Sequence, residues 1–131
     1  MKNATADPPT VEDQGAPPPD LEAMRDAVNC LLDPDAVPEA LPPAPEELDT
    51  LTLQLRGHVG LLVAEVEQMA LRLPKDSIPR YCALACLGEA REKLRAQPGG
   101  GPHGALVYAR RLARVLNALC DHHEALSGSP S

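Results

Sequence analysis

The chain has 131 residues, a length typical of one domain, and contains no Trp, no Phe and only two Tyr. A core must therefore be built from Leu, Val, Ala, Met and Cys, which suits closely packed helices better than a sheet. The formal net charge of −7 is unevenly distributed, because residues 1–50 carry twelve acidic and two basic side chains whereas residues 51–131 carry seven and ten. The acidic part is either a solvated tail or a segment that lies over the more basic part.

Hydropathy indicates a protein of the cytoplasm. The first residues contain no apolar signal-peptide core, and no stretch has the about 20 apolar residues that a membrane-spanning helix needs. The most apolar stretch, residues 61–73, is interrupted by Glu65, Glu67 and Arg72. We therefore expect a soluble cytoplasmic protein without membrane contact, whose four cysteines are free thiols.

Prolines and acidic residues dominate the beginning of the chain. Residues 1–19 have almost no bulky apolar side chains and are predicted to form a disordered acidic tail. Residues 20–33 are predicted to form a short amphipathic helix, because apolar residues recur on one helical face after the potential N-cap Asp20. Residues 34–45 are predicted to be a linker, because each proline biases the preceding residue away from helical geometry.

A helical bundle domain is predicted over residues 46–126, followed by a loose tail over residues 127–131. Apolar residues recur there at helical spacing, interrupted by proline- and glycine-rich segments. These patterns predict three long helices, at residues 46–73, 78–96 and 103–126. In the first of them Leu53, Leu61 and Val63 lie off the main apolar stripe, so more than one face of this helix is expected to be covered.

The expected fold class is all-α: an antiparallel bundle of three long helices plus a short N-terminal helix. Short connections between long helices imply antiparallel neighbours. Three helices rich in Leu and Ala make a thin core, and small domains bury a small fraction of their surface. We therefore expect that the helix beginning at Asp20 docks as a fourth element, that the bundle dimerises, or both.

Three cysteines and a histidine form a candidate metal site. Cys82 and Cys86 are spaced i and i+4, and Cys120 and His123 are spaced i and i+3, so each pair lies on one side of its helix. An antiparallel hairpin places both pairs at a similar level, where they could bind Zn²⁺, or copper as Cu(I) with Met69 added. The alternatives are a reactive thiol site and inert core cysteines, since free Cys is often buried.

Three other motifs give weaker evidence for a functional site. The string Gly99–Gly104 fits G-x-G-x-x-G but follows a predicted helix and no strand, so we interpret it as a linker. His122 and His123 have no nucleophile with an orienting partner, and no catalytic residue is predicted. A basic cluster lacks the interleaved aromatic residues of single-strand nucleic-acid binders and is interpreted as a solvated face. Its members are Arg110, Arg111 and Arg114.

Four segments of the bundle region carry a resemblance to a known family. They are residues 55–62 (LRGHVGLL), 73–76 (LPKD), 79–91 (PRYCALACLGEAR) and 109–122, within which ARRLAR is followed by ALCDH. Through these segments, about residues 45–126 resemble an uncharacterised actinobacterial family of short helical proteins that is grouped by name with natural product biosynthesis. This resemblance implies a bacterial cytosolic protein associated with secondary metabolism, and it transfers no catalytic residue.

These features predict a non-enzymatic interaction or accessory protein. Its expected partner is another protein or a second copy of the chain, and neither nucleic acid nor a membrane. The alternative function is a zinc or copper protein, or a thiol-redox protein, using Cys82, Cys86, Cys120 and His123.

Overall fold

The computed structural model describes residues 19–32, 44–100 and 103–127, and these residues form four α-helices and no strand. In chain order the helices are α2 (Leu21–Leu32), α3 (Pro45–Leu71), α4 (Ile78–Arg95) and α5 (Gly104–Ser127). The all-α prediction is confirmed. The predicted disordered tail, most of the predicted linker and the end of the predicted C-terminal tail lie outside the described residues.

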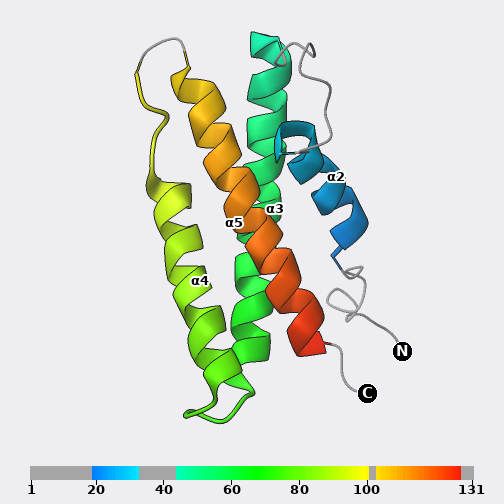
Figure 1. The fold of residues 1–131 in the computed structure, drawn as a ribbon, viewed down its shortest axis with the longest axis vertical. Helices are drawn as coiled ribbons and strands as arrows, with labels where there is room; N and C mark the ends of the chain where they lie inside the picture. Colours follow the sequence, from blue (N-terminus) through cyan, green and yellow to red (C-terminus); the bar gives the residue numbers. More distant parts are fainter. Residues whose placement is uncertain (1–18, 33–43, 101–102, 128–131) are drawn as a thin grey trace, which may run out of the picture.

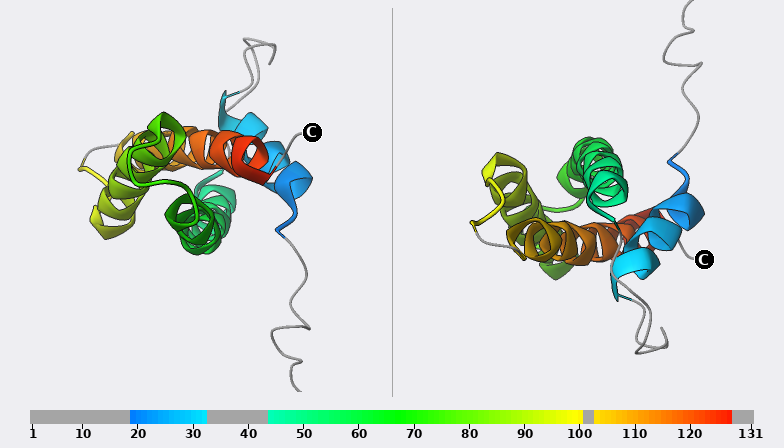
Figure 2. Two further views of the ribbon diagram at one scale, coloured as in Figure 1. Left: turned by 90° about the horizontal axis from the view of Figure 1, so that it is seen from below. Right: turned by 90° about the horizontal axis from the view of Figure 1, so that it is seen from above.

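The helices are arranged as a row of three with one helix packed across it. α4, α5 and α2 lie side by side with α5 in the middle, and α3 covers one side of this row (Figures 1 and 2). α5 contacts all three other helices, whereas α2 and α4 do not contact each other. Consecutive helices of the α3–α4–α5 unit run antiparallel, as predicted (Figure 1). The outer side of α3, opposite the row, has no other described helix against it (Figure 2).

Short-range hydrogen bonds fix the helix ends. The Asp20 carboxylate accepts a hydrogen bond of 3.0 Å from the backbone N–H of Ala23, which confirms the predicted N-cap of α2. The Ser77 hydroxyl caps α4 by accepting from the Arg80 N–H at 3.3 Å. The Arg80 guanidinium donates to the carbonyls of Leu71 and Leu73, so the beginning of α4 satisfies carbonyls at the end of α3.

The core is apolar and centred on α5. Among the described residues, no polar or charged side chain is fully buried. The predicted apolar stripe of α3 faces this core. Its central members are inaccessible to solvent: Leu55, Val59, Leu62 and Val66. The largest fully buried side chains are Met24, Leu55, Val59, Leu62, Val66, Leu87, Leu112, Leu116, Leu119 and Cys120.

Tyr108 is a polar link between three helices. Its ring is buried in α5, and its hydroxyl accepts a hydrogen bond from the Arg56 guanidinium of α3. The same hydroxyl donates to the Lys93 carbonyl of α4 at 3.1 Å. A single phenol group therefore satisfies one donor and one acceptor from two other helices.

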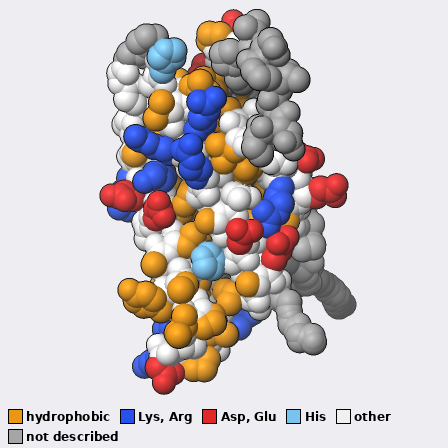
Figure 3. Space-filling model, viewed as in Figure 1, with side chains coloured by type: hydrophobic (Ala, Val, Ile, Leu, Met, Phe, Trp, Pro, Cys, Tyr) orange, Lys and Arg blue, Asp and Glu red, His pale blue; other side chains and the backbone are white. Residues whose placement is uncertain are grey.

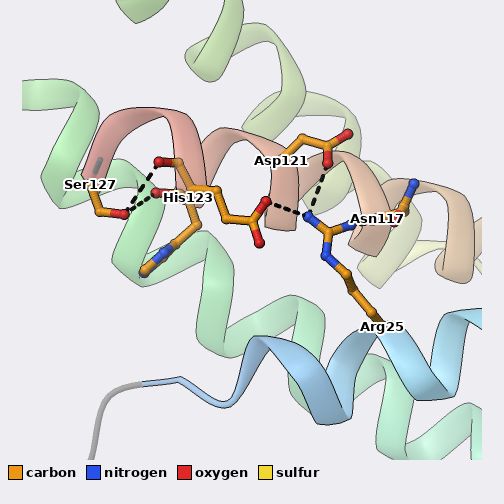
Figure 4. Close-up of polar contacts among 6 residues, drawn as sticks. Arg25, Asn117, Asp121, His123 and Ser127 are labelled. Atoms are coloured by element: carbon orange, nitrogen blue, oxygen red, sulfur yellow. Dashed lines mark hydrogen bonds and ion pairs between the residues drawn. The ribbon is translucent and has the colours of Figure 1, made fainter. Parts of the chain in front are cut away.

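The short helix α2 docks on α5, so one of the two expected ways to extend the core is confirmed. Met24, Val28 and Leu31 are buried in the contact. At its edge the Arg25 guanidinium donates to Asn117 at 2.8 Å and forms ion pairs with two carboxylates of α5 (Figure 4). These are Asp121 at 3.0 Å and Glu124 at 2.8 Å.

Candidate functional site

The four cysteines lie in different environments. Cys86 on α4 and Cys120 on α5 are buried, whereas Cys82 on α4 is exposed, as is Cys30 on α2. On α4 the inward stripe runs through Ala83, Cys86, Leu87 and Ala90, which leaves Cys82 at the edge of the exposed side. The i, i+4 spacing places Cys82 and Cys86 on the same side of α4. Because of how α4 is rotated about its axis, Cys86 nevertheless lies in the core and Cys82 at the surface.

His123 faces α3. Its side chain is 14% exposed, and its Nε2 lies 3.9 Å from a carboxylate oxygen of Glu65. Its Nδ1 is buried without a hydrogen-bond partner among the described residues. No group of three or more His, Cys, Asp or Glu side chains in the described ranges is arranged to hold a metal ion. The zinc or copper site at Cys82, Cys86, Cys120 and His123 therefore stays a prediction without geometric support.

A basic surface lies over α4 and α5, on the side of the row opposite α3 (Figure 3). Lys93, Arg111 and Arg114 line an open pocket of about 290 Å³, together with Glu89 and small apolar residues. A second open pocket of about 330 Å³ shares Arg111 and is bordered by the linker that precedes α5. Both pockets are open surface depressions, and the one buried polar group among their lining residues, the Tyr108 hydroxyl, already forms hydrogen bonds with Arg56 and the Lys93 carbonyl.

The outer side of α3 is uncharged and mostly apolar over five turns. We call this surface the α3 outer face and define it by the exposed residues of α3 from Leu53 onward: Leu53, Gln54, Gly57, Gly60, Leu61, Ala64, Gln68 and Leu71. Leu53 is 70% exposed, Leu61 is 47% exposed and Leu71 is 53% exposed. An exposed helix surface is normally charged or polar, so this surface resembles the contact region of an interface.

Two glycines on the α3 outer face are not required by packing against the other described helices. Gly57 and Gly60 lie in the helix interior, where glycine costs about 0.5–1 kcal/mol relative to alanine. A Cβ atom added at either position would meet no other atom within 4 Å, so the packing of this chain does not require glycine there. Glycine at both positions does allow another backbone to approach α3 closely.

The family comparison covers most of the bundle. A family model described as "Family of unknown function (DUF6415)" matches residues 22–128. The chain belongs to the DUF6415 family. No curated protein and no solved structure matches this chain.

The match assigns this chain to the DUF6415 family, whose function is unknown, and it therefore indicates no activity. It includes α2, which the sequence resemblance to a family left outside its range. Within the described residues of this DUF6415 member, no helix is both long and apolar enough to cross a membrane.

The buried thiols of this DUF6415 protein are held protonated. Burial, with the nearby charges of Glu89 and Asp121 adding to it, raises the pKa of Cys86 to about 11. Burial also raises the pKa of Cys120, although Arg25 opposes this shift. Since thiolates are the nucleophiles and metal ligands, neutral thiols at both positions favour a packing role over a redox role.

Alkaline pH is expected to destabilise the fold through Cys86. The ordinary pKa of its thiol is 9.0, so between pH 9.0 and about 11 the unfolded chain loses this proton while the folded chain keeps it. The free energy of unfolding then falls by up to about 1.4 kcal/mol per pH unit in this interval. Urea denaturation across this interval tests the effect. Cys86→Ala should flatten the pH dependence, the exposed-thiol control Cys82→Ala should keep it, and equal slopes for the two variants would contradict the assignment.

Proposed function

We propose that this DUF6415 member is a non-enzymatic helical interaction or accessory protein. The observation that supports the proposal best is the α3 outer face, an uncharged surface with three exposed leucines. Burying apolar surface contributes about 25 cal/mol per Å², so covering these leucines with a partner is favourable. A protein partner is the occupant that such a surface fits, because charged and small polar ligands would find no ionic group on it.

The other described surfaces give little support to an enzymatic function. The basic pockets over α4 and α5 are open, and the tyrosine nearest to them, Tyr108, already uses its hydroxyl to link three helices. The buried thiols are protonated. A catalytic site needs a nucleophile or base held in reach of a reacting atom, and the described residues supply no such arrangement.

The metal or thiol function is the second proposal, and it keeps Cys82, Cys86, Cys120 and His123 as its residues. Its single favourable observation is the buried Nδ1 of His123, which has no hydrogen-bond partner in the described part of the chain. Metal analysis of anaerobically purified protein tests it. Zinc or copper at one equivalent that is lost in Cys82→Ser would support the metal function, whereas metal-free protein would exclude it.

A photocrosslinking amino acid placed at Gln68, on the α3 outer face, tests the interaction function in cells. We expect a crosslinked protein adduct of defined mass at Gln68 and none at the exposed α4 position Glu92. A second change, Leu61→Lys, should abolish the Gln68 adduct, because it places a charge in an apolar contact. The matched control Ile78→Lys changes a side chain that is 75% exposed on α4 and should leave the adduct intact. Equal labelling at both positions, or none at either, would contradict the proposal.

We also propose that the interaction serves secondary metabolism. The support is the sequence resemblance of residues 45–126 to a family grouped by name with natural product biosynthesis. Deletion of the gene should change the profile of secreted secondary metabolites, and the unmodified gene should restore it whereas the Leu61→Lys gene should not. An unchanged profile after deletion would remove this part of the proposal.

A further inference from the structure

We infer that the occupant of the α3 outer face is a second copy of this chain, packed with its α3 antiparallel to the first. The inference rests on the proposed function, because it names the partner of the same surface. Its basis is that the α3 outer face is complementary to itself, in shape and in charge, when one copy is reversed. A self-complementary surface is what a two-fold symmetric dimer requires.

The α3 outer face carries small residues, Gly57, Gly60 and Ala64, around the central Leu61, and larger residues towards both ends. In an antiparallel pair centred between Gly60 and Leu61, Leu61 lies opposite Gly60 of the second copy. The same register places Ala64 opposite Gly57 and Gln68 opposite Leu53. Leu61 thus meets a glycine near the crossing, and the two backbones can approach closely where the glycines lie, whereas Leu53 and Gln68 pack against each other further out.

Charged residues flank the α3 outer face at both ends, with opposite signs. Glu46 and Asp49 are exposed in the first turns of α3, and Arg72 and Lys75 are exposed at and after its end. These charges also suit the dipole of α3 itself. In the register that pairs Leu61 with Gly60, Asp49 lies opposite Arg72 of the second copy.

The symmetry of the pair repeats the contact between Asp49 and Arg72 at its other end, so both ends of the pair bring unlike charges together. In a parallel pair, like charges would meet at both ends instead. Charge pairs at the rim of an interface contribute little affinity but select orientation and register. The charges therefore favour the antiparallel dimer that the pairing of Leu61 with Gly60 also favours.

The opposite surface of the molecule does not compete for this role. Lys93, Arg111 and Arg114 gather on the α4–α5 side of the row, where a symmetric contact through the basic cluster would bring cations together (Figure 3). The α3 outer face projects from the other side of the row (Figure 2). A dimer through α3 leaves the basic surface open in both copies.

The oligomeric state of the full chain tests the dimer. Sedimentation velocity is expected to show a dimer for the unmodified chain, and Leu61→Lys should raise its Kd at least about tenfold. Gly60→Leu should do the same, because the added side chain fills the space that the second copy needs. Ile78→Lys is the matched control and should leave the Kd unchanged. Circular dichroism should show unchanged helix content in all three variants, since none of these side chains is in the core.

Disulfide trapping tests the register, in a Cys30→Ser and Cys82→Ser background that removes the exposed thiols. Leu61→Cys lies beside the symmetry axis and should crosslink to its own copy. Leu53→Cys should crosslink only when mixed with Gln68→Cys. Self-crosslinking of Leu53→Cys would indicate a parallel pair and overturn the proposed register.

A monomer in sedimentation would overturn the dimer itself. If the Gln68 photocrosslinker then captured a different protein, the interaction function would stand and only the identity of its partner would be wrong. If the Gln68 photocrosslinker captured nothing, both would fail.

Discussion

Replacing Leu112 with alanine is expected to lower the free energy of unfolding by about 2–5 kcal/mol. Leu112 is inaccessible to solvent in the middle of α5, the helix that contacts all three others. Removing its side chain deletes buried apolar surface and leaves a cavity, which neighbours on several helices would have to fill at once. For a chain of this size, the loss is a large share of total stability.

Urea denaturation followed by circular dichroism measures this effect. Ile78→Ala is the control, because Ile78 is 75% exposed and its truncation should change stability by no more than about 0.5 kcal/mol. A Leu112→Ala variant as stable as the control would mean that α5 is not the centre of the core.

Tyr108→Phe is expected to cost about 1–3 kcal/mol, although it removes only one oxygen atom. The ring stays packed, but the Arg56 guanidinium loses its acceptor and the Lys93 carbonyl loses its donor. A partly buried charged donor without a partner has a larger penalty than a neutral one. The variant should therefore unfold at lower urea concentration with an unchanged denaturant slope.

The chain offers a matched control in its other tyrosine. Tyr81 is 75% exposed, so Tyr81→Phe should have almost no effect on stability. A double-mutant cycle with Arg56→Met separates the contribution of the hydrogen bond from the loss of each side chain. Additive effects of Arg56→Met and Tyr108→Phe would show that the two groups do not interact in solution.

Most of the fold could be predicted from the sequence because local signals coincide with its helix boundaries. Apolar residues at helical spacing define α3, and the prolines at 45 and 74 lie at its two ends. The cap at Asp20 was predictable from residue type alone. The docking of α2 mainly on α5, with a smaller contact to α3 and none to α4, depends on long-range packing that no local pattern encodes.

The thiol site shows the limit of spacing arguments. A spacing of i and i+4 places two residues on the same side of a helix, but it does not say how far that side turns from the core. In α4 the core stripe is set by Ala83, Leu87 and Ala90, and the helix turns so that Cys86 is buried and Cys82 is exposed. The orientation of α4 about its own axis decides this, and it depends on how α4 packs against α3 and α5.

Part of the α3 outer face could be predicted from the sequence. Leu53 and Leu61 lie off the main stripe, which predicted that more than one side of this helix is covered. Recognising the surface also required the structure, because only the structure shows that the Cβ positions of Gly57 and Gly60 open to empty space. The sequence alone could not distinguish glycines that serve packing within the chain from glycines that leave room for another molecule.

The central place of α5 also bears on how the chain folds during synthesis. The helix that contacts all the others is the last of the four to be made, and Arg25 on α2 pairs with Asp121 across 96 residues of sequence. Contacts of such long sequence separation form more slowly than those of a bundle with only local contacts. Until α5 emerges from the ribosome, the apolar side of α2 lacks its main contact, so the nascent chain passes through a stage in which chaperones could bind it.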